Sequence, residues 1–80
     1  MNKPYMQLVN DLLERHDFSL YIKGSAGASM QAESLVRGLQ GLRQAAFCAD
    51  DAIAFQELSH LIIRAENGDP IQPYNTAVAA

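Results

Sequence analysis

The chain has 80 residues, of which 49% are hydrophobic and 19% are charged, and its formal net charge at pH 7 is −3. This length and composition fit one small domain and exclude a disordered chain of low hydrophobicity. The negative charge argues against a general nucleic-acid binder, because such domains present a basic face. A chain of this size buries a limited core, and its single cysteine, Cys48, excludes an internal disulfide. Oligomerisation is the main remaining source of stability, so we expect a homodimer.

A first amphipathic helix is predicted from about Pro4 to His16. Proline is favoured in a first helical turn, and apolar residues then recur at spacings of three and four, which places them on one face. That face consists of Tyr5, Leu8, Val9, Leu12, Leu13 and His16. We interpret His16 as a helix-end histidine partly packed in the core, with a pH-sensitive contact or ligand as the alternative.

Residues 18–23 alternate apolar and polar side chains, which is typical of a strand. A single strand cannot satisfy its own backbone groups. The segment therefore pairs with a second chain, forms an extended connector, or continues the first helix, and we favour an extended segment. Residues 24–28 form a glycine-containing break. A loop before a helix can bind phosphate through backbone N–H groups, but residues 23–29 match no phosphate-binding motif and predict a plain linker.

Two further helices are predicted, one from Ser29 as its N-cap to about Cys48 and one from about Asp51 to Glu66. Their apolar stripes are rotated by roughly 110° from each other at 100° per residue, so one straight helix could not present both to one partner. The stripes are Leu35, Val36, Leu39, Leu42 and Ala46, then Ala54, Phe55, Leu58, Leu61, Ile62 and Ala65. We therefore predict a turn near residues 48–51 and a helical hairpin, with one long helix as the alternative.

Local signals mark both ends of the last helix. Asp50 and Asp51 suit a helix start, because aspartate caps the free N–H groups and complements the helix dipole. Asn67 and Gly68, followed by Pro70, predict where the helix ends.

The sequence thus predicts an all-α fold with a short N-terminal helix, an extended Gly-rich connector, an antiparallel helical hairpin and a proline-containing extended tail. Residues 1–68 form the single small helical domain and residues 69–80 form the tail. Ile71 and Tyr74 are candidates to pack back onto the hairpin. The last residues, 77–80, resemble the Ala-Ala endings that bacterial unfolding proteases read, which would imply rapid turnover. We favour a frayed tail.

Small residues recur at spacings of three and four along the second predicted helix, at Gly38, Gly41, Ala45 and Ala49. Glycine costs up to about 1 kcal/mol in a helix interior, so this small-residue seam is easiest to justify where another backbone comes close. Two glycines without such a role are the alternative. Combining seam and stripes, the predicted interaction residues are Leu35, Leu39, Leu42, Gly38, Gly41, Ala45, Phe55, Leu58 and Ile62.

Few residues in the sequence are candidates for catalysis or metal binding. Glu57 and His60 form an E-x-x-H motif, and paired copies of this motif build di-iron sites in helical bundles. Only one copy is present, and with Arg64 it is interpreted as a solvated polar row. Cys48 with His16 or His60 could form a nucleophile pair, but nothing places them together, and we interpret Cys48 as a small buried thiol. We expect no enzymatic activity, no cofactor and no metal.

The leading functional prediction is a small non-enzymatic protein–protein interaction module, serving as an adaptor, an inhibitor or a chaperone-like regulator. It would bind another protein through an apolar groove or helix face with an acidic rim, because more apolar surface is patterned than one short chain readily buries. No secretory signal and no apolar run of membrane-spanning length is present, so we expect a cytoplasmic protein and no membrane partner.

Two alternatives belong to other classes. A dimeric transcriptional regulator would contact DNA through Lys23, Arg37 and Arg43, but the would-be recognition helix opens with two aspartates that phosphate repels. A metal-binding sensor or enzyme would use His16, Cys48, Glu57 and His60.

Overall fold

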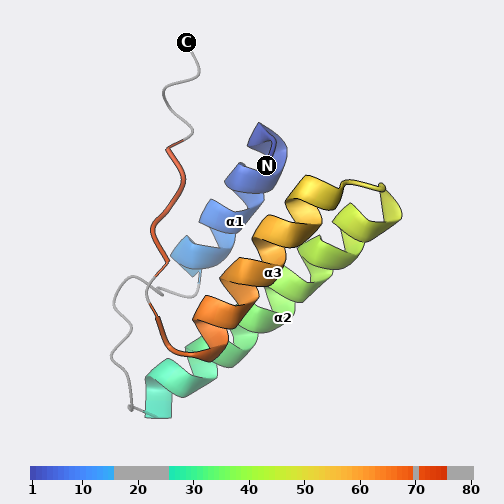
Figure 1. Cartoon of the computed structure of the whole chain (residues 1–80). Helices are drawn as coiled ribbons and strands as arrows, with labels where there is room; N and C mark the ends of the chain where they lie inside the picture. The colour runs from blue at the N-terminus through green and yellow to red at the C-terminus, as the bar shows by residue number, and fades with distance from the viewer. Residues whose placement is uncertain (16–25, 70, 76–80) are drawn as a thin grey trace.

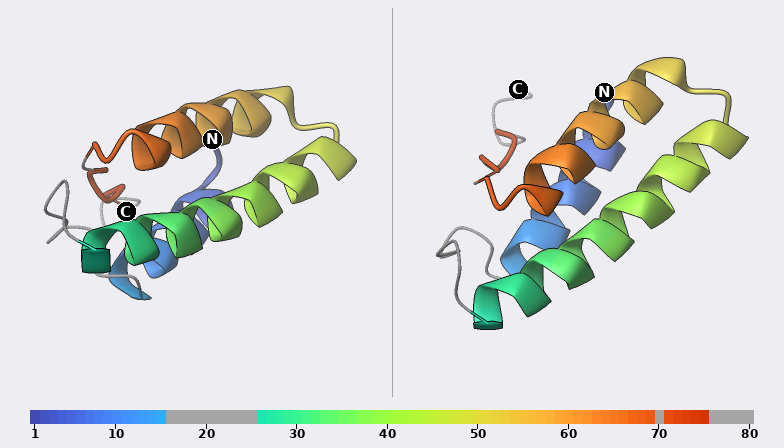
Figure 2. Two further views of the ribbon diagram at one scale, coloured as in Figure 1. Left: turned by 90° about the horizontal axis from the view of Figure 1, so that it is seen from below. Right: turned by 60° about the horizontal axis from the view of Figure 1, so that its bottom comes forward.

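The computed structural model describes residues 1–15, 26–69 and 71–75, with side chains from residue 33 onward in the second helix. The described part of the chain contains three helices and no strand: α1 (Lys3–Arg15), α2 (Ala26–Cys48) and α3 (Ala52–Glu66). This confirms the all-α class. Helices α2 and α3 lie side by side, and α1 lies against the pair (Figures 1 and 2). The predicted connector at 18–23, His16, Lys23 and the last residues, 77–80, lie outside the described residues.

The start of α2 differs from the prediction. The helix begins at Ala26, so Ser29 lies within it and is not its N-cap. Alanine has the highest intrinsic helix propensity, and Ala26 and Ala28 flank a single glycine whose cost is about 1 kcal/mol. The helix therefore includes residues 26–28 of the segment that we interpreted as a break, and residues 24 and 25 lie outside the described residues.

Helix α1 is capped by Asn2, which was not predicted as a cap. The Asn2 side-chain Oδ1 accepts a hydrogen bond from the Tyr5 backbone N–H at 3.3 Å. Asparagine is among the preferred N-cap residues because its side chain satisfies one of the free N–H groups of the first turn. Val9 and Leu13 on the next turns are buried, which fixes the face that α1 turns toward the other helices.

A glycine sets how closely α1 approaches α2. A Cβ atom at Gly38 would lie 2.7 Å from Cδ2 of Leu12 and 3.0 Å from its Cδ1. Both distances are shorter than an ordinary van der Waals contact between carbon atoms. The absence of a side chain at Gly38 therefore allows the Leu12 side chain of α1 to pack directly on the α2 backbone.

The chain leaves α2 through a Schellman motif. The Asp51 N–H donates to the Ala46 carbonyl at 2.9 Å, and the Asp50 N–H donates to the Phe47 carbonyl at 3.1 Å. These two bonds satisfy carbonyls that the helix end leaves free. The motif requires a left-handed residue, and Asp50 takes that conformation with φ of 58°. Glycine is the usual residue at this position.

Helix α3 ends in the same way. The Asp69 N–H donates to the Arg64 carbonyl at 2.9 Å, and the Gly68 N–H donates to the Ala65 carbonyl at 3.1 Å. The left-handed residue here is Gly68, with φ of 77°. This confirms the predicted stop at Asn67 and Gly68.

Asp51 also begins α3. Its Oδ1 accepts a hydrogen bond from the Ala54 backbone N–H at 3.1 Å, which makes it the N-cap. The predicted role of aspartate at this helix start is confirmed for Asp51. One residue thus closes the end of α2 through its backbone and caps α3 through its side chain.

The core lies between the three helices and includes one residue beyond them. The buried hydrophobic residues are Val9, Leu13, Leu35, Leu39, Ala46, Ala54, Leu58, Ile62, Ala65 and Ile71. Tyr74 packs against this core and is held by the α1 side chain of Asn10, which donates to the Tyr74 carbonyl at 2.7 Å and accepts from its N–H at 2.8 Å. Residues 71–75 therefore run beside α1 as a packed part of the fold (Figure 1).

Candidate protein-interaction surface

Four of the predicted interaction residues lie inside the molecule. Leu35, Leu39, Leu58 and Ile62 are buried in the core, and Leu42 is partly buried against it. Their apolar surface holds the three helices of one chain together.

The small-residue seam divides between two environments. Gly38 lies against Leu12 of α1, as described above. A Cβ at Gly41 would meet nothing within 4 Å, and both Gly41 and Ala45 are exposed. A close helix contact within the chain therefore accounts for Gly38 and does not account for Gly41.

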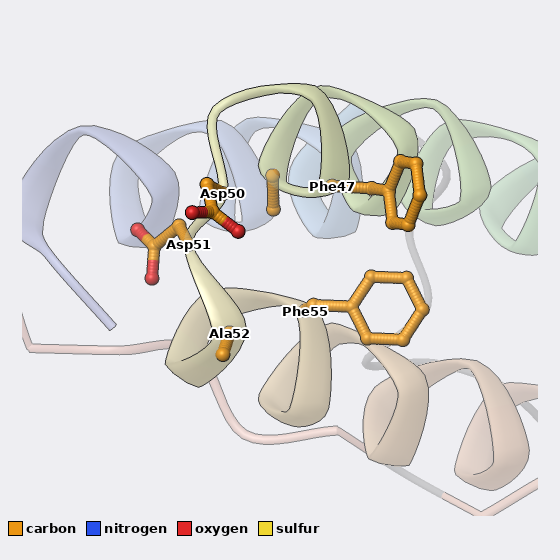
Figure 3. A pocket seen from close by; sticks show the side chains of 6 residues that line it. Phe47, Asp50, Asp51, Ala52 and Phe55 are labelled. Carbon is orange, nitrogen blue, oxygen red and sulfur yellow. The ribbon is translucent and has the colours of Figure 1, made fainter.

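Two phenylalanines remain uncovered on either side of the turn. The Phe47 side chain, in the last turn of α2, is 65% exposed, and that of Phe55, in the first turn of α3, is 38% exposed. Their ring centroids lie 6.1 Å apart with an interplanar angle of 53°, an arrangement typical of favourable aromatic pairs. Figure 3 shows both rings projecting to the same side of the helix pair.

This aromatic pair points away from α1. Phe47 follows Gly38 by nine residues, which is about half a turn around the helix axis at 100° per residue. Gly38 faces α1, so Phe47 faces the opposite way. On α3, Glu57 faces the start of the chain, and Phe55 lies two residues earlier, again close to half a turn away.

The rings border an open cavity at the turn. The cavity has a volume of about 340 Å³ and is lined by Ala46, Phe47, Asp50, Asp51, Ala52 and Phe55. Figure 3 shows the two aspartates at one side and the aromatic rings at the other. The cavity is therefore apolar over most of its wall and acidic at the turn.

One cation adjoins the rings. The Arg43 guanidinium carbon lies 5.6 Å from the Phe55 ring centroid, within the range of a cation–π interaction. Within the part of the chain that the structure describes, neither Arg43 nor Asp50 forms an ion pair. We call Arg43, Phe47, Asp50 and Phe55, together with the cavity between them, the phenylalanine patch.

Of the residues in this patch, only Phe55 was predicted from the sequence to lie at an interface. Phe47 lies off the leucine stripe of α2, and Arg43 was considered only as a contact to DNA. A usable signal was present, because two aromatic residues stand close to the predicted turn, one on each side. The left-handed conformation of Asp50 gave no comparable signal, since glycine is the residue that usually marks it.

Glu57 is not part of a fully solvated row. Its Oε1 accepts a hydrogen bond from the Met1 amino group at 2.8 Å, and this ion pair is partly buried. Burial, the charge of Glu57 and a hydrogen bond to that carboxylate raise the pKa of Tyr74 above its ordinary value of 10.0. The long-range contact explains the difference from the prediction, because the start of the chain and residue 74 both reach this face of α3. His60 is exposed.

Cys48 also differs from the prediction, because it is exposed and not buried. It follows the last core position of α2, Ala46, by two residues, which turns it toward the opposite side of the helix. Its Sγ lies 3.7 Å from Nε2 of Gln44. Among the described residues, no group of three or more His, Cys, Asp or Glu side chains is placed to hold a metal ion.

The fold and the patch define a class: a small all-α protein, with three helices in its described residues and an exposed aromatic and charged patch at the turn between α2 and α3. None of the helices in the described ranges is long and apolar enough to cross a membrane. The chain belongs to the family described as a domain of unknown function (DUF4754), whose model matches residues 1–80. No curated protein and no solved structure matches the chain.

Proposed function

We propose that the protein is a small non-enzymatic protein–protein interaction module that binds its partner through the phenylalanine patch. The observation that supports this proposal is the exposure of Phe47 at 65% beside Phe55, on a face that none of the three described helices covers. Aromatic residues and arginine are enriched at protein interfaces, where they contribute most of the binding energy. In this proposal the antiparallel α2–α3 hairpin presents the patch, and the module acts in the cytoplasm as an adaptor, an inhibitor or a chaperone-like regulator.

The arginines favour this proposal over DNA binding. Arg37 pairs with Glu33 at 2.9 Å, one turn earlier in α2. Arg43 lies over an aromatic ring on the same patch as Asp50. A phosphate-binding face needs several cations clear of carboxylates, and Arg37 is already paired with one while Arg43 stands over the Phe55 ring.

Photo-crosslinking tests the proposal at a single residue. A photoreactive phenylalanine analogue is placed at position 47 in the expressed chain, and the matched control carries it at position 53. Phe47 and Ile53 are almost equally exposed, at 65% and 67%, but Ile53 does not line the cavity. We expect a discrete covalent adduct from position 47 that disappears when Phe55→Ser is added, and no such adduct from position 53.

Equal adducts from both positions would show contact without a defined surface and would overturn the proposal. The absence of any adduct from position 47 would also overturn it. The adduct mass shows whether the captured protein is a second copy or a different chain, which separates this proposal from the more specific one below.

A further inference from the structure

We infer that the occupant of the phenylalanine patch is a second copy of this chain, related by a two-fold axis, with Arg43 of each copy paired to Asp50 of the other. This inference rests on the proposed function and names its partner. A two-fold interface uses the same surface on both copies, so the surface must be complementary to itself. The phenylalanine patch meets that condition in its charges and in their order along the chain.

The charges of the patch match those of a second copy. The patch carries one cation, Arg43, and one exposed anion, Asp50, and neither is ion-paired within the described part of the chain. Asp51 also lines the cavity, but it is partly buried and accepts the Ala54 N–H as the cap of α3. A patch of a single sign would attract a partner of the opposite charge and repel its own copy. A patch with both signs, each without an ionic partner, is complementary to itself.

The order of these residues along the chain also fits a two-fold axis. Arg43 lies about one helical turn before Phe47 in α2, and Asp50 lies on the other side of Phe47, in the turn that follows the end of α2. A two-fold axis that crosses α2 at Phe47 reverses the direction of the helix in the second copy. It therefore places each arginine opposite the aspartate of the other copy, with the aromatic rings between the two pairs.

The backbone at Asp50 supports the same pairing. The Schellman motifs at the ends of α2 and α3 each need a residue in the left-handed conformation. That residue is Gly68 at the end of α3 and Asp50 at the end of α2. A side chain in this conformation is less favourable than glycine, although aspartate tolerates it better than most residues. A carboxylate that pairs with a second chain accounts for an aspartate at a position where glycine is the ordinary choice.

Exposed residues continue this surface beyond the two rings. A stable interface buries on the order of 800 Å² on each partner, more than two phenylalanines supply. Ser59 and Ile63 follow Phe55 at four-residue spacing and continue the same row along α3, and Ile63 is 54% exposed. The cavity between Phe47 and Phe55, with a volume of about 340 Å³, receives side chains of the second copy.

Mixing two charge-reversal variants tests the inference. In a dimer of Arg43→Glu, the introduced glutamate of each copy faces Asp50 of the other, so both pairs are negative. In a dimer of Asp50→Lys, the introduced lysine of each copy faces Arg43 of the other, so both pairs are positive. A dimer with one copy of each variant contains one pair between the introduced glutamate and lysine and one natural Arg43–Asp50 pair, so both pairs are of opposite charge. Sedimentation equilibrium of each variant and of an equimolar mixture measures the molar mass, with circular dichroism confirming that each variant is helical.

We expect the natural sequence to form a dimer of about twice 8.8 kDa and each variant alone to dissociate with a Kd raised about tenfold or more. The mixture is expected to recover the dimer. The control is Arg37→Glu, which reverses a charge on α2 away from the patch and is expected to leave the dimer intact. A natural chain that stays monomeric, variants that still dimerise alone, or a mixture that stays monomeric would each overturn the inference. A monomer that still gives an adduct with another protein at position 47 would leave the proposed function standing.

Discussion

Asp50 and Gly68 hold the same place in two helix ends with the same hydrogen bonds, and they differ in their side chains. Asp50→Gly is expected to raise the free energy of unfolding by up to about 1 kcal/mol, because it removes the steric cost of a left-handed non-glycine residue. Asp50→Asn keeps a residue that tolerates this conformation and is expected to change stability by less than about 0.5 kcal/mol. Urea denaturation at low protein concentration, where self-association adds little stability, measures both variants. A loss of stability in Asp50→Gly would contradict this account of the turn.

Gly38 and Gly41 both lie within α2, but only Gly38 contacts another helix. Gly41→Ala is expected to stabilise the protein by up to about 1 kcal/mol, because alanine has the higher helix propensity and a Cβ there meets open space. Gly38→Ala gains the same propensity but must displace Leu12, so it is expected to be less stable than Gly41→Ala by about 1 kcal/mol. Thermal unfolding of the two variants compares them directly. Equal stability would mean that Gly38 does not control the approach of α1.

At the scale of the elements, α3 depends on the residue that precedes it. Asp51→Ala removes the side-chain acceptor for the Ala54 N–H and is expected to cost about 1 kcal/mol, with a range of roughly 0.5–2 kcal/mol. Asp51→Ser restores an N-cap oxygen without the charge and is expected to recover most of the loss. Urea denaturation of both variants provides the measurement. If serine were no better than alanine, the charge of Asp51 and not its hydrogen bond would be the important property.

The segment 71–75 predicts how stability depends on pH. The pKa of Tyr74 is raised in the folded protein, first by burial and then by Glu57, so folding favours the neutral phenol. Its contribution to stability is therefore fully present below about pH 10, the pKa of a tyrosine in the unfolded chain, and is lost as the pH rises through the higher folded value. Unfolding free energies measured from pH 8 to above pH 10 are expected to fall less steeply in Tyr74→Phe than in the natural sequence.

Tyr5→Phe is the control for this measurement, because it leaves Tyr74 in place and is expected to keep the steeper fall. The same slope in Tyr74→Phe and in the natural sequence would mean that ionisation of Tyr74 does not oppose folding.

Local signals in the sequence predicted those parts of the fold that depend on short-range chemistry. The core stripe of α3, the cap at Asp51 and the stop at Gly68 all follow from spacing and capping within a few residues. The contact of Glu57 with Met1 and the clamp of Asn10 on Tyr74 join residues far apart in the chain, and no local pattern indicates them.

In the candidate site, too, local patterns in the sequence did not indicate what depends on long-range packing. Leu35, Leu39, Leu58 and Ile62 were assigned to an interface because an amphipathic pattern does not say whether the same chain or a second one covers it. Phe47 was overlooked because it lies outside the main stripe. Packing of the three helices decides which apolar residues stay exposed, and that packing is a property of the whole molecule.

For the whole molecule, we infer that the phenylalanine patch joins two copies of the chain. The most direct test is the molar mass in solution, measured by light scattering from micromolar to near-millimolar concentration, for the natural sequence, Phe47→Ser and Ile53→Ser. Serine replaces an equally exposed apolar side chain in both variants, and only Phe47 belongs to the patch. The account predicts a dimer for the natural sequence and Ile53→Ser, and a monomer for Phe47→Ser. A natural chain that is monomeric throughout, or a Phe47→Ser variant that dimerises as well as the natural chain, would contradict it.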